Sequence, residues 1–305
     1  YAGVQNGIER VSKIMMPILI VLSVIIAIYS VTRPGALEGV KYFLVPNIKN
    51  FSWMTVVTAM GQMFYSLSIA MGILVTFGSY MRKDTSIEDS TRNVEIFDTA
   101  IAMMAGLMII PAVFAFSGGD PNTLQAGPSL MFITIPKVFA NMGFGTAVGI
   151  LFFVLVLFAA VTSSIALTES AVSTFEDELG WGRKKATILT GVIMIALGTL
   201  SCLGYGPLDF VKIIGMQFLD FFDFLTNSVM MPIAALMTSL LVSRVIGVDK
   251  IEEEIRHGES AFRRKKIFVV MIKYLCPIFA LIILASSVAN AFGWISRYED
   301  KKSLF

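Results

Sequence analysis

The feature that most constrains the fold is an apolar run, from about Met54 to Tyr80, that is interrupted halfway along. The small and polar residues at its middle are Gly61, Gln62, Ser66, Ser68 and Gly72. A helix in hydrocarbon has to satisfy its own backbone polar groups, and it opens most easily at glycine. Interrupted backbone at membrane depth is tolerated where it is buried in protein or lines a cavity. The run therefore predicts a broken membrane helix beside a binding site near the bilayer midplane, as in secondary transporters.

The composition identifies the whole chain, residues 1–305, as one polytopic membrane domain. Hydrophobic residues make up 56% and charged residues only 15%, and the mean hydropathy is +0.77. Apolar windows of about 18 residues or more predict membrane helices. Seven spans are predicted, at 14–31, 54–80, 88–117, 145–175, 185–203, 210–244 and 267–293. Residues 118–144, which combine a Gly-Gly-Asp-Pro-Asn turn with a short apolar stretch, are predicted to form an extracellular lid hairpin.

The basic residues predict the orientation of these spans. About two thirds of the 24 Lys and Arg residues fall in loops that lie on one side if the chain enters the membrane from the cytoplasm at Ile14. The positive-inside rule then places the C-terminus outside. Because the chain opens at Tyr1 with no Met and no signal peptide, we interpret it as the C-terminal part of a longer protein.

Polar residues occur at similar depth in three of the predicted spans: Ser66 and Ser68, Asp98, and Thr162 with Ser163 and Ser164. Hydroxyl groups in membrane helices often bond back to a helix carbonyl, which is the structural alternative to a functional role. Asp98 differs, because an ionised carboxylate at this depth costs a few kcal/mol or more. The sequence places the basic residues near the helix ends, so a bound cation, Na⁺ or a proton, is the predicted partner. The alternative is a protonated Asp98 bonded to a helix carbonyl.

Four segments together resemble the neurotransmitter:sodium symporters, and the bacterial amino-acid transporters among them most closely. These segments are Gly61 to Asp84, Phe132 to Pro136, Thr162 to Ala166, and Phe175 to Leu179. The resemblance implies the all-α, inverted-repeat fold of leucine-transporter-like proteins, in which helices one to five are repeated upside down by six to ten. In that register the chain holds family helices five to eleven, and the first four are absent.

The resemblance also implies two sodium sites. Ser66 and Asp98 would belong to the first, and the Ala159 carbonyl with the Thr162 and Ser163 hydroxyls to the second. Chloride-dependent members have a neutral Asn where this chain has Asp98. We therefore expect the Asp98 carboxylate to supply the negative charge that chloride provides in those members, and transport to be independent of chloride.

The resemblance also implies which residues form the substrate pocket, the gates and a hinge. The implied substrate pocket consists of Tyr65, Ser66, Ser68, Met71, Ser163 and Leu167. Asp220 fits the outer gate, with Asp223 as the alternative, and Asp177 fits the inner gate with Tyr80 packed beside it. Gly7 and Pro17 match the spacing of a hinge at which family helix five unwinds.

The predicted function is sodium-coupled symport of a hydrophobic or aromatic L-amino acid by alternating access, in a bacterial inner membrane. The expected partners are the amino acid, the lipid bilayer and the missing helices one to four, and no nucleic acid is expected. A symporter of the same architecture for another zwitterionic solute or another cation is the alternative. A seven-helix receptor does not suit the basic-residue count. An enzyme is not predicted, because no span presents a catalytic constellation at one depth.

Overall fold

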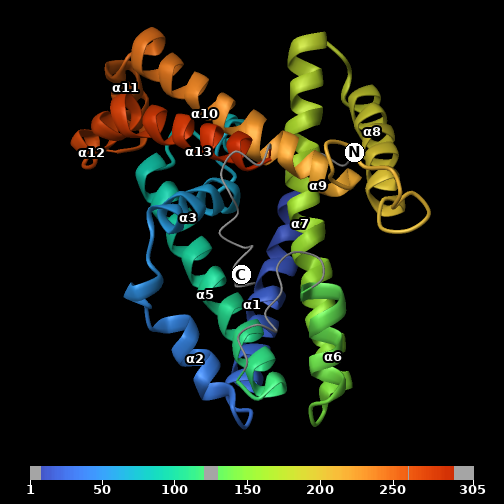
Figure 1. Cartoon of the computed structure of the whole chain (residues 1–305). Coiled ribbons are helices and arrows are strands. Elements are labelled where there is room, and N and C mark those ends of the chain that lie inside the picture. The colour runs from blue at the N-terminus through green and yellow to red at the C-terminus, as the bar shows by residue number, and fades with distance from the viewer. Residues whose placement is uncertain (1–7, 120–129, 260, 292–305) are drawn as a thin grey trace. The chain divides into compact units, whose positions relative to one another are not determined.

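The computed structural model describes residues 8–119, 130–259 and 261–291, and the regular secondary structure within these ranges is helical (Figure 1). No β-strand occurs in them, and the isolated bridge that they contain joins Ile213 and Met216. Helices are the expected outcome for so apolar a chain, because a helix satisfies its backbone polar groups within one segment.

Six helical stretches of the described chain are long and apolar enough to cross a bilayer. Their bounds are Arg10–Val31, Ile87–Ser117, Gly145–Leu179, Arg183–Leu203, Phe218–Ile246 and Lys265–Ala289. At most 28% of the apolar window of any of them is buried within the chain. Most of their apolar surface is therefore left for lipid or for further protein.

The interrupted run behaves differently from these six. It forms two shorter helices, α3 (Trp53–Ser66) and α4 (Ile73–Ser79), and residues 67–72 between them are not helical. Helix α3 begins at a capping box, in which Ser52 and Thr55 each satisfy the other's backbone N–H. The break lies where glycine and serine weaken the apolar pattern.

The last two apolar stretches each change helix type along their length. The first contains α9 (Phe218–Asp223), the π-helical η5 (Phe224–Met230), α10 (Met231–Leu240) and the π-helical η6 (Leu241–Ile246). The second contains α12 (Lys265–Val270), the π-helical η7 (Met271–Leu275) and α13 (Cys276–Ala291). Pro232 and Pro277 lie in the first turns of α10 and α13, directly after π segments. A proline cannot donate to the carbonyl four residues earlier, which suits a widened turn before it.

One predicted boundary differs from the structure, and one predicted feature lies partly outside the described residues. The start of the sixth span at Phe210 is wrong, because residues 210–217 turn through Gly215 (φ 78°) and the Ile213–Met216 bridge before α9 begins. Of the predicted lid hairpin, the structure describes 118–119 and 130–144. These contain η4 (Leu130–Thr134) and α6 (Ile135–Ala140).

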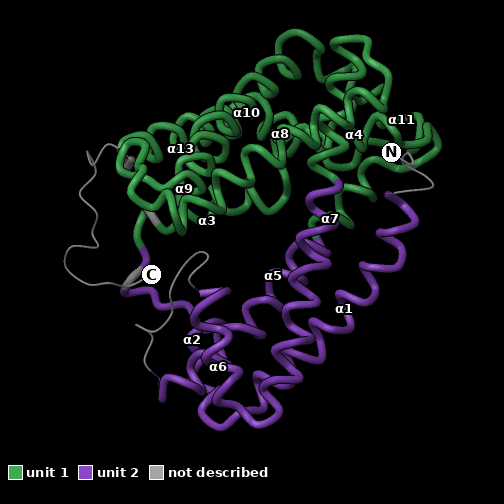
Figure 2. The backbone as a smooth tube through the Cα atoms, turned by 90° about the vertical axis from the view of Figure 1, so that its right-hand side faces the viewer, with its two compact units in different colours: residues 1, 52–95, 166–296 green, residues 2–51, 96–165, 297–305 purple. Residues whose placement is uncertain are grey.

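The chain divides into two compact units (Figure 2). The second unit holds α1 (Arg10–Val31), α2 (Ala36–Leu44), the short η2 (Ile48–Asn50), η4, α6, α5 (Ile87–Ser117) from Ile96 onward and α7 (Gly145–Leu179) up to Ile165. Its core joins α1, α5, α6 and α7 through fully buried side chains such as Ile26, Val113, Ile135 and Phe152. Close helix packing is possible where Gly39 of α2 meets Pro111 of α5, since a Cβ at Gly39 would lie 2.8 Å from the Pro111 Cα.

The first unit holds α3, α4, the start of α5, the end of α7, α8 (Arg183–Leu203), and α9 to α13 with α11 (Val248–Gly258). Its core joins α3, α10 and α13 through Phe64, Met231, Ala235, Ala280 and Ile283. The helix break lies in this unit, directly against that core.

Candidate functional site

The break between α3 and α4 is built from residues in the left-handed region. The φ angles are 54° at Ser68, 63° at Ala70 and 79° at Gly72. Left-handed residues cannot continue a right-handed helix, so α3 ends with the N–H of Leu67 donating to the Met63 carbonyl at 3.0 Å. The carbonyl groups of residues 67–71 therefore lie outside the regular hydrogen-bond ladder of the α-helix. Such carbonyls are the ligands that broken helices offer to alkali cations.

Ala70 provides a direct test of this backbone. An L-residue in the left-handed region costs about 1–2 kcal/mol, whereas glycine adopts it freely. We expect Ala70→Gly to raise the stability of the complete protein by about 1 kcal/mol, seen as a higher melting temperature in detergent. Ala196, an exposed residue inside α8, is the matched control, and its change to Gly should lower stability by about 1 kcal/mol. Equal losses from both substitutions would contradict the left-handed assignment.

The predicted pocket residues of this segment differ in their surroundings. Met71, with Ile69 and Ala70, packs against the core of α3, α10 and α13 and is partly buried. Tyr65 and Ser66 are exposed within the described chain, and Ser68 is half-buried. Leu167, further along on α7, is 48% exposed. The structure therefore leaves the Tyr65 and Ser66 side chains accessible, while Met71 is held by packing.

The two residues predicted for the first sodium site lie in different units. Ser66 ends α3 in the first unit, and Asp98 lies on the part of α5 in the second, where it is half-buried. Their joint site therefore stays a prediction.

The residues predicted for the second sodium site lie on one face of a single helix turn in α7. The Thr162 hydroxyl donates to the Phe158 and Ala159 carbonyls, at 3.0 Å each. The Ala159 carbonyl and the Thr162 hydroxyl, both predicted ligands, are thus already adjacent. The exposed Ser163 follows directly. A hydroxyl that donates to a carbonyl keeps its lone pairs for a cation, so this bond is compatible with the predicted role.

The predicted hinge is only partly covered by the structure. Pro17 lies inside α1, which continues without interruption from Arg10 to Val31. Gly7 lies outside the described residues.

A buried ionic network lies where α4, α7 and α8 meet in the first unit. Glu169 of α7 is only 4% exposed. Arg183 of α8 donates to its two carboxylate oxygens from Nη1 at 3.0 Å and from Nη2 at 2.5 Å. The Tyr80 hydroxyl, at the end of α4, donates to the same carboxylate at 2.9 Å. Arg183 also pairs with Glu176 at 3.3 Å. Glu169 is therefore the charged centre that ties the segment after the helix break to α7 and α8.

Sequence reasoning missed Glu169 and assigned a different neighbour to Tyr80. Tyr80 was expected to pack beside Asp177, whereas its hydroxyl binds Glu169 and Asp177 is exposed. The available signal was a single acidic residue late in the apolar stretch of α7, with an arginine at the start of the next helix.

Two hydroxyls pack beside this network. Thr76 of α4 and Ser170 of α7 are both 8% exposed, and their oxygens lie 3.4 Å apart. A Cβ at Gly72 would lie 2.7 Å from the Ser170 hydroxyl. Glycine is favoured there by its positive φ, and a larger residue would also have to displace the Ser170 hydroxyl.

The predicted outer gate residue, Asp220, is exposed and accepts a hydrogen bond from the Tyr205 hydroxyl at 3.4 Å. Burial, and then the neighbouring Asp220 carboxylate, raise the pKa of Tyr205. The alternative, Asp223, accepts from the Asn227 amide at 2.6 Å. Both carboxylates are thus oriented by neighbours within the first unit.

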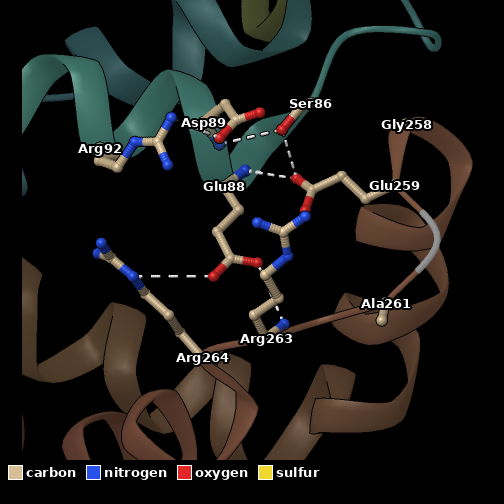
Figure 3. A pocket seen from close by; sticks show the side chains of 9 residues that line it. All are labelled: Ser86, Glu88, Asp89, Arg92, Gly258, Glu259, Ala261, Arg263 and Arg264. Carbon is tan, nitrogen blue, oxygen red and sulfur yellow. Dashed lines mark hydrogen bonds and ion pairs between the residues drawn. The ribbon is translucent and has the colours of Figure 1, made fainter.

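A second charged cluster clasps the beginning of α5 (Figure 3). The Glu259 carboxylate accepts from the Ser86 hydroxyl at 2.7 Å and from the Glu88 N–H at 2.8 Å, so it caps this helix. In return, the Glu88 carboxylate accepts from the backbone N–H of Arg263 at 3.1 Å. The Arg264 guanidinium pairs at 3.1 Å with Glu95, which lies about two turns after Glu88 on α5. This cluster, termed the α5 clasp, joins the segment after α11 to the helix that carries Asp98.

The clasp makes stability depend on pH in a defined direction. The hydrogen bonds from Ser86 and from the Glu88 N–H hold the pKa of Glu259 below its ordinary value. Its stabilising effect is therefore complete above the unfolded pKa, about 4.3, and is lost as the pH falls through the lower folded pKa. Glu259→Gln should reduce the fall in melting temperature between pH 5 and pH 3, when both proteins are melted in the same detergent. Glu254→Gln, at an exposed position of α11, is the control and should leave that slope unchanged. Identical slopes for Glu259→Gln and the unaltered protein would refute the capping role.

With this geometry established, the comparisons with known proteins identify the family. The sodium:neurotransmitter symporter family matches residues 1–300. The Bacillus subtilis strain 168 protein YhdH, named an uncharacterized sodium-dependent transporter, is 36% identical over 289 residues, which cover 94% of this chain and 63% of the relative. An uncharacterized sodium-dependent transporter of Haemophilus influenzae is 32% identical over 287 residues, which cover 94% of this chain and 62% of the relative.

Among solved structures, the crystal structure of MhsT in complex with L-phenylalanine matches with a TM-score of 0.80 and 36% sequence identity. The match covers 93% of this chain and 64% of that one. This chain therefore spans less than two thirds of the length of the proteins it resembles. The likeness confirms the leucine-transporter-like fold, and the relatives are transporters rather than enzymes. The chain is a multi-pass membrane protein that belongs to the sodium:neurotransmitter symporter family.

Proposed function

We propose that the complete protein takes up a hydrophobic or aromatic L-amino acid together with Na⁺ by alternating access. The observation that carries this proposal is the helix break at residues 67–72, where backbone carbonyls leave the regular hydrogen-bond ladder next to the hydroxyls of Ser66 and Ser68. Broken helices of this kind hold the substrate and the coupling ion in transporters with inverted repeats. The family match and the phenylalanine complex of MhsT support the same substrate class.

Sodium is the co-transported ion, and we propose two sites for it. Ser66 and Asp98 contribute to the first, and the Ala159 carbonyl with the Thr162 and Ser163 hydroxyls to the second. The 3.0 Å contact between the Thr162 hydroxyl and the Ala159 carbonyl supports the second site, because it already brings two of the proposed oxygen ligands side by side. Hard oxygen ligands suit a small alkali cation. Coupling follows if sodium binds the outward-open state more tightly than the inward-open state.

We further propose that Asp98 makes transport independent of chloride. A fixed carboxylate supplies the negative charge that balances the cations in the site. The next helical turn carries Ala102, whose methyl group cannot help to bind an anion.

The substrate pocket of this proposal combines hydroxyls for the zwitterionic head with apolar surface for the side chain. It is formed by Tyr65, Ser66, Ser68, Met71, Ser163 and Leu167. Tyr65 acts as the aromatic lid, which its exposure permits. Helices one to four of the family are expected to complete both the pocket and the sodium sites.

The proposed gates follow the charged groups described above. Asp220 serves the outer gate, and Asp177 with the Tyr80–Glu169 pair serves the inner one. Gly7 and Pro17 form the hinge through which water reaches the second sodium site.

The C-terminus lies outside and the protein resides in a bacterial inner membrane. A C-terminal reporter that is active only in the cytoplasm should therefore stay inactive.

The deciding experiment measures binding of radiolabelled amino acids to the complete protein in sodium chloride, sodium gluconate, potassium chloride and lithium chloride. We expect binding of apolar or aromatic amino acids in both sodium salts and little binding in potassium. Loss of binding in gluconate would overturn the chloride proposal alone. Equal binding in potassium would overturn sodium coupling and favour another cation. A screen in which only other zwitterionic solutes bind would overturn the substrate class.

A further inference from the structure

A groove of about 740 Å³ lies at the start of α8, within the first unit. Its lining includes Trp181, Lys184, Lys185, Ile188, Leu189 and Val192. One end of this lining is basic and aromatic, and the other is aliphatic. The two ends are separated by about two turns of α8, or about 12 Å at 1.5 Å per residue.

The basic end carries positive charge that the described chain leaves uncompensated. Neither Lys184 nor Lys185 forms an ion pair within the described ranges, whereas the preceding Arg183 is bound by Glu169 and Glu176. The Lys185 ammonium lies 3.8 Å from the centre of the Trp181 ring. This cation–π contact orients the ammonium without neutralising it, so its N–H donors stay available to an anion.

The helix itself adds to the positive potential. Gly182 occupies the N-cap position of α8 and provides no side-chain cap, and the first turn contains no acidic residue. The N-terminal N–H groups of a helix are favourable partners for phosphate, particularly beside lysine.

The aliphatic end is exposed in a way that suits lipid. Ile188 and Val192 are 59% and 57% exposed, and 11% of the apolar window of α8 is buried within the chain. Tryptophan and lysine at the end of a membrane helix are typical of the headgroup level. The groove thus places an anion-binding end at the headgroups and an apolar wall along the acyl chains.

We propose that this groove binds an anionic phospholipid. The phosphate contacts Lys184, Lys185 and the uncapped start of α8, and an acyl chain lies against Ile188, Leu189 and Val192. Charge complementarity selects an anionic lipid over a zwitterionic one, because each lysine near such a surface favours anionic lipid by about a factor of five. The inference does not depend on sodium coupling, so the two proposals fail independently.

The test uses the complete protein reconstituted in phosphatidylcholine vesicles that contain either brominated phosphatidylglycerol or brominated phosphatidylcholine. The signal of Trp181 is isolated by subtracting the fluorescence of a Trp181→Phe variant. We expect brominated phosphatidylglycerol to quench Trp181 more strongly than brominated phosphatidylcholine at the same mole fraction. Lys184→Gln with Lys185→Gln should weaken the preference for phosphatidylglycerol by about 30-fold. Lys250→Gln, at an exposed lysine of α11, is the control for the loss of a lysine elsewhere and should leave the preference unchanged.

Three results would overturn the proposal. Equal quenching by the two brominated lipids would show that the groove does not select charge. Absence of quenching by either would show that another part of the protein covers it. Full relief of phosphatidylglycerol quenching by millimolar inorganic phosphate would identify a soluble anion as the occupant. If the double lysine variant does not fold, the comparison of the two lipids on the unaltered protein and on Lys184→Gln alone decides the question.

Discussion

Arg183→Gln is expected to destabilise the complete protein by about 3 kcal/mol, which corresponds to a fall in melting temperature of about 5–10 °C. The physical reason is the carboxylate that the substitution leaves behind. Glu169 is 4% exposed, and Arg183 supplies two of the hydrogen bonds that satisfy it. Removing one partner of a buried ion pair costs more than the pair contributes, because the remaining charge stays buried without compensation.

A double-mutant cycle separates this effect from a loss of packing. Glu169→Gln combined with Arg183→Gln should recover most of the lost stability, since no buried charge remains. Glu176→Gln is the internal control, because the Glu176 side chain is 27% exposed and its longer ion pair with Arg183 is worth about 1 kcal/mol or less. Additive losses for Glu169 and Arg183 in melting experiments would show that the two side chains do not act as a pair.

The network also bears on the proposed transport cycle. Tyr80 ends α4, the helix that follows the break, and its hydroxyl binds the same carboxylate that Arg183 holds. The position of α4 is therefore tied to α7 and α8 through one buried charge. If α4 moves relative to α7 and α8 in the proposed transport cycle, these hydrogen bonds have to be exchanged or broken, and Arg183→Gln should shift that balance as well as the stability.

Sequence analysis predicted the helix break because the break has a local cause. Glycines and serines weaken the apolar pattern between Met54 and Tyr80, and the structure has its left-handed residues at Ser68, Ala70 and Gly72. Ala70 itself carries no such signal, since alanine favours helices. Ala70 packs against the core of α3, α10 and α13, and these tertiary contacts cannot be read from the local sequence.

The buried role of Glu169 and the α5 clasp could not be predicted from the local sequence. Both depend on residues that lie far apart in the chain, such as Ser86 and Glu259, and hydropathy alone does not reveal which of several charges will meet. Asp98 was recognisable because it stands in the middle of a predicted apolar span, whereas Glu169 stands near the end of the predicted span 145–175, where hydropathy alone does not show whether a charge is solvated or buried. The start of the sixth span was misplaced because the apolar residues at 210–217 form a turn instead of a helix.

Asp98→Asn is expected to weaken sodium activation of substrate binding by about 100-fold, or about 2.7 kcal/mol. The substitution keeps the size of the side chain and one carbonyl oxygen, so it removes chiefly the negative charge. A carboxylate within a membrane span is costly unless a cation accompanies it, and the free energy of that pairing appears as sodium affinity.

The same variant tests the chloride argument, because a site that has lost its fixed charge regains it only by binding an anion. Chloride should supply part of that charge even though Ala102 offers it no hydroxyl, so substrate binding by Asp98→Asn should be stronger in sodium chloride than in sodium gluconate, whereas the unaltered protein should bind equally in both. Titrating sodium in each salt separates the two effects. Asp249→Asn, at an exposed position in the first turn of α11, is the control for the loss of one carboxylate elsewhere. Unchanged sodium affinity in gluconate would show that Asp98 is not the charge that holds sodium, and the protonated alternative would replace it.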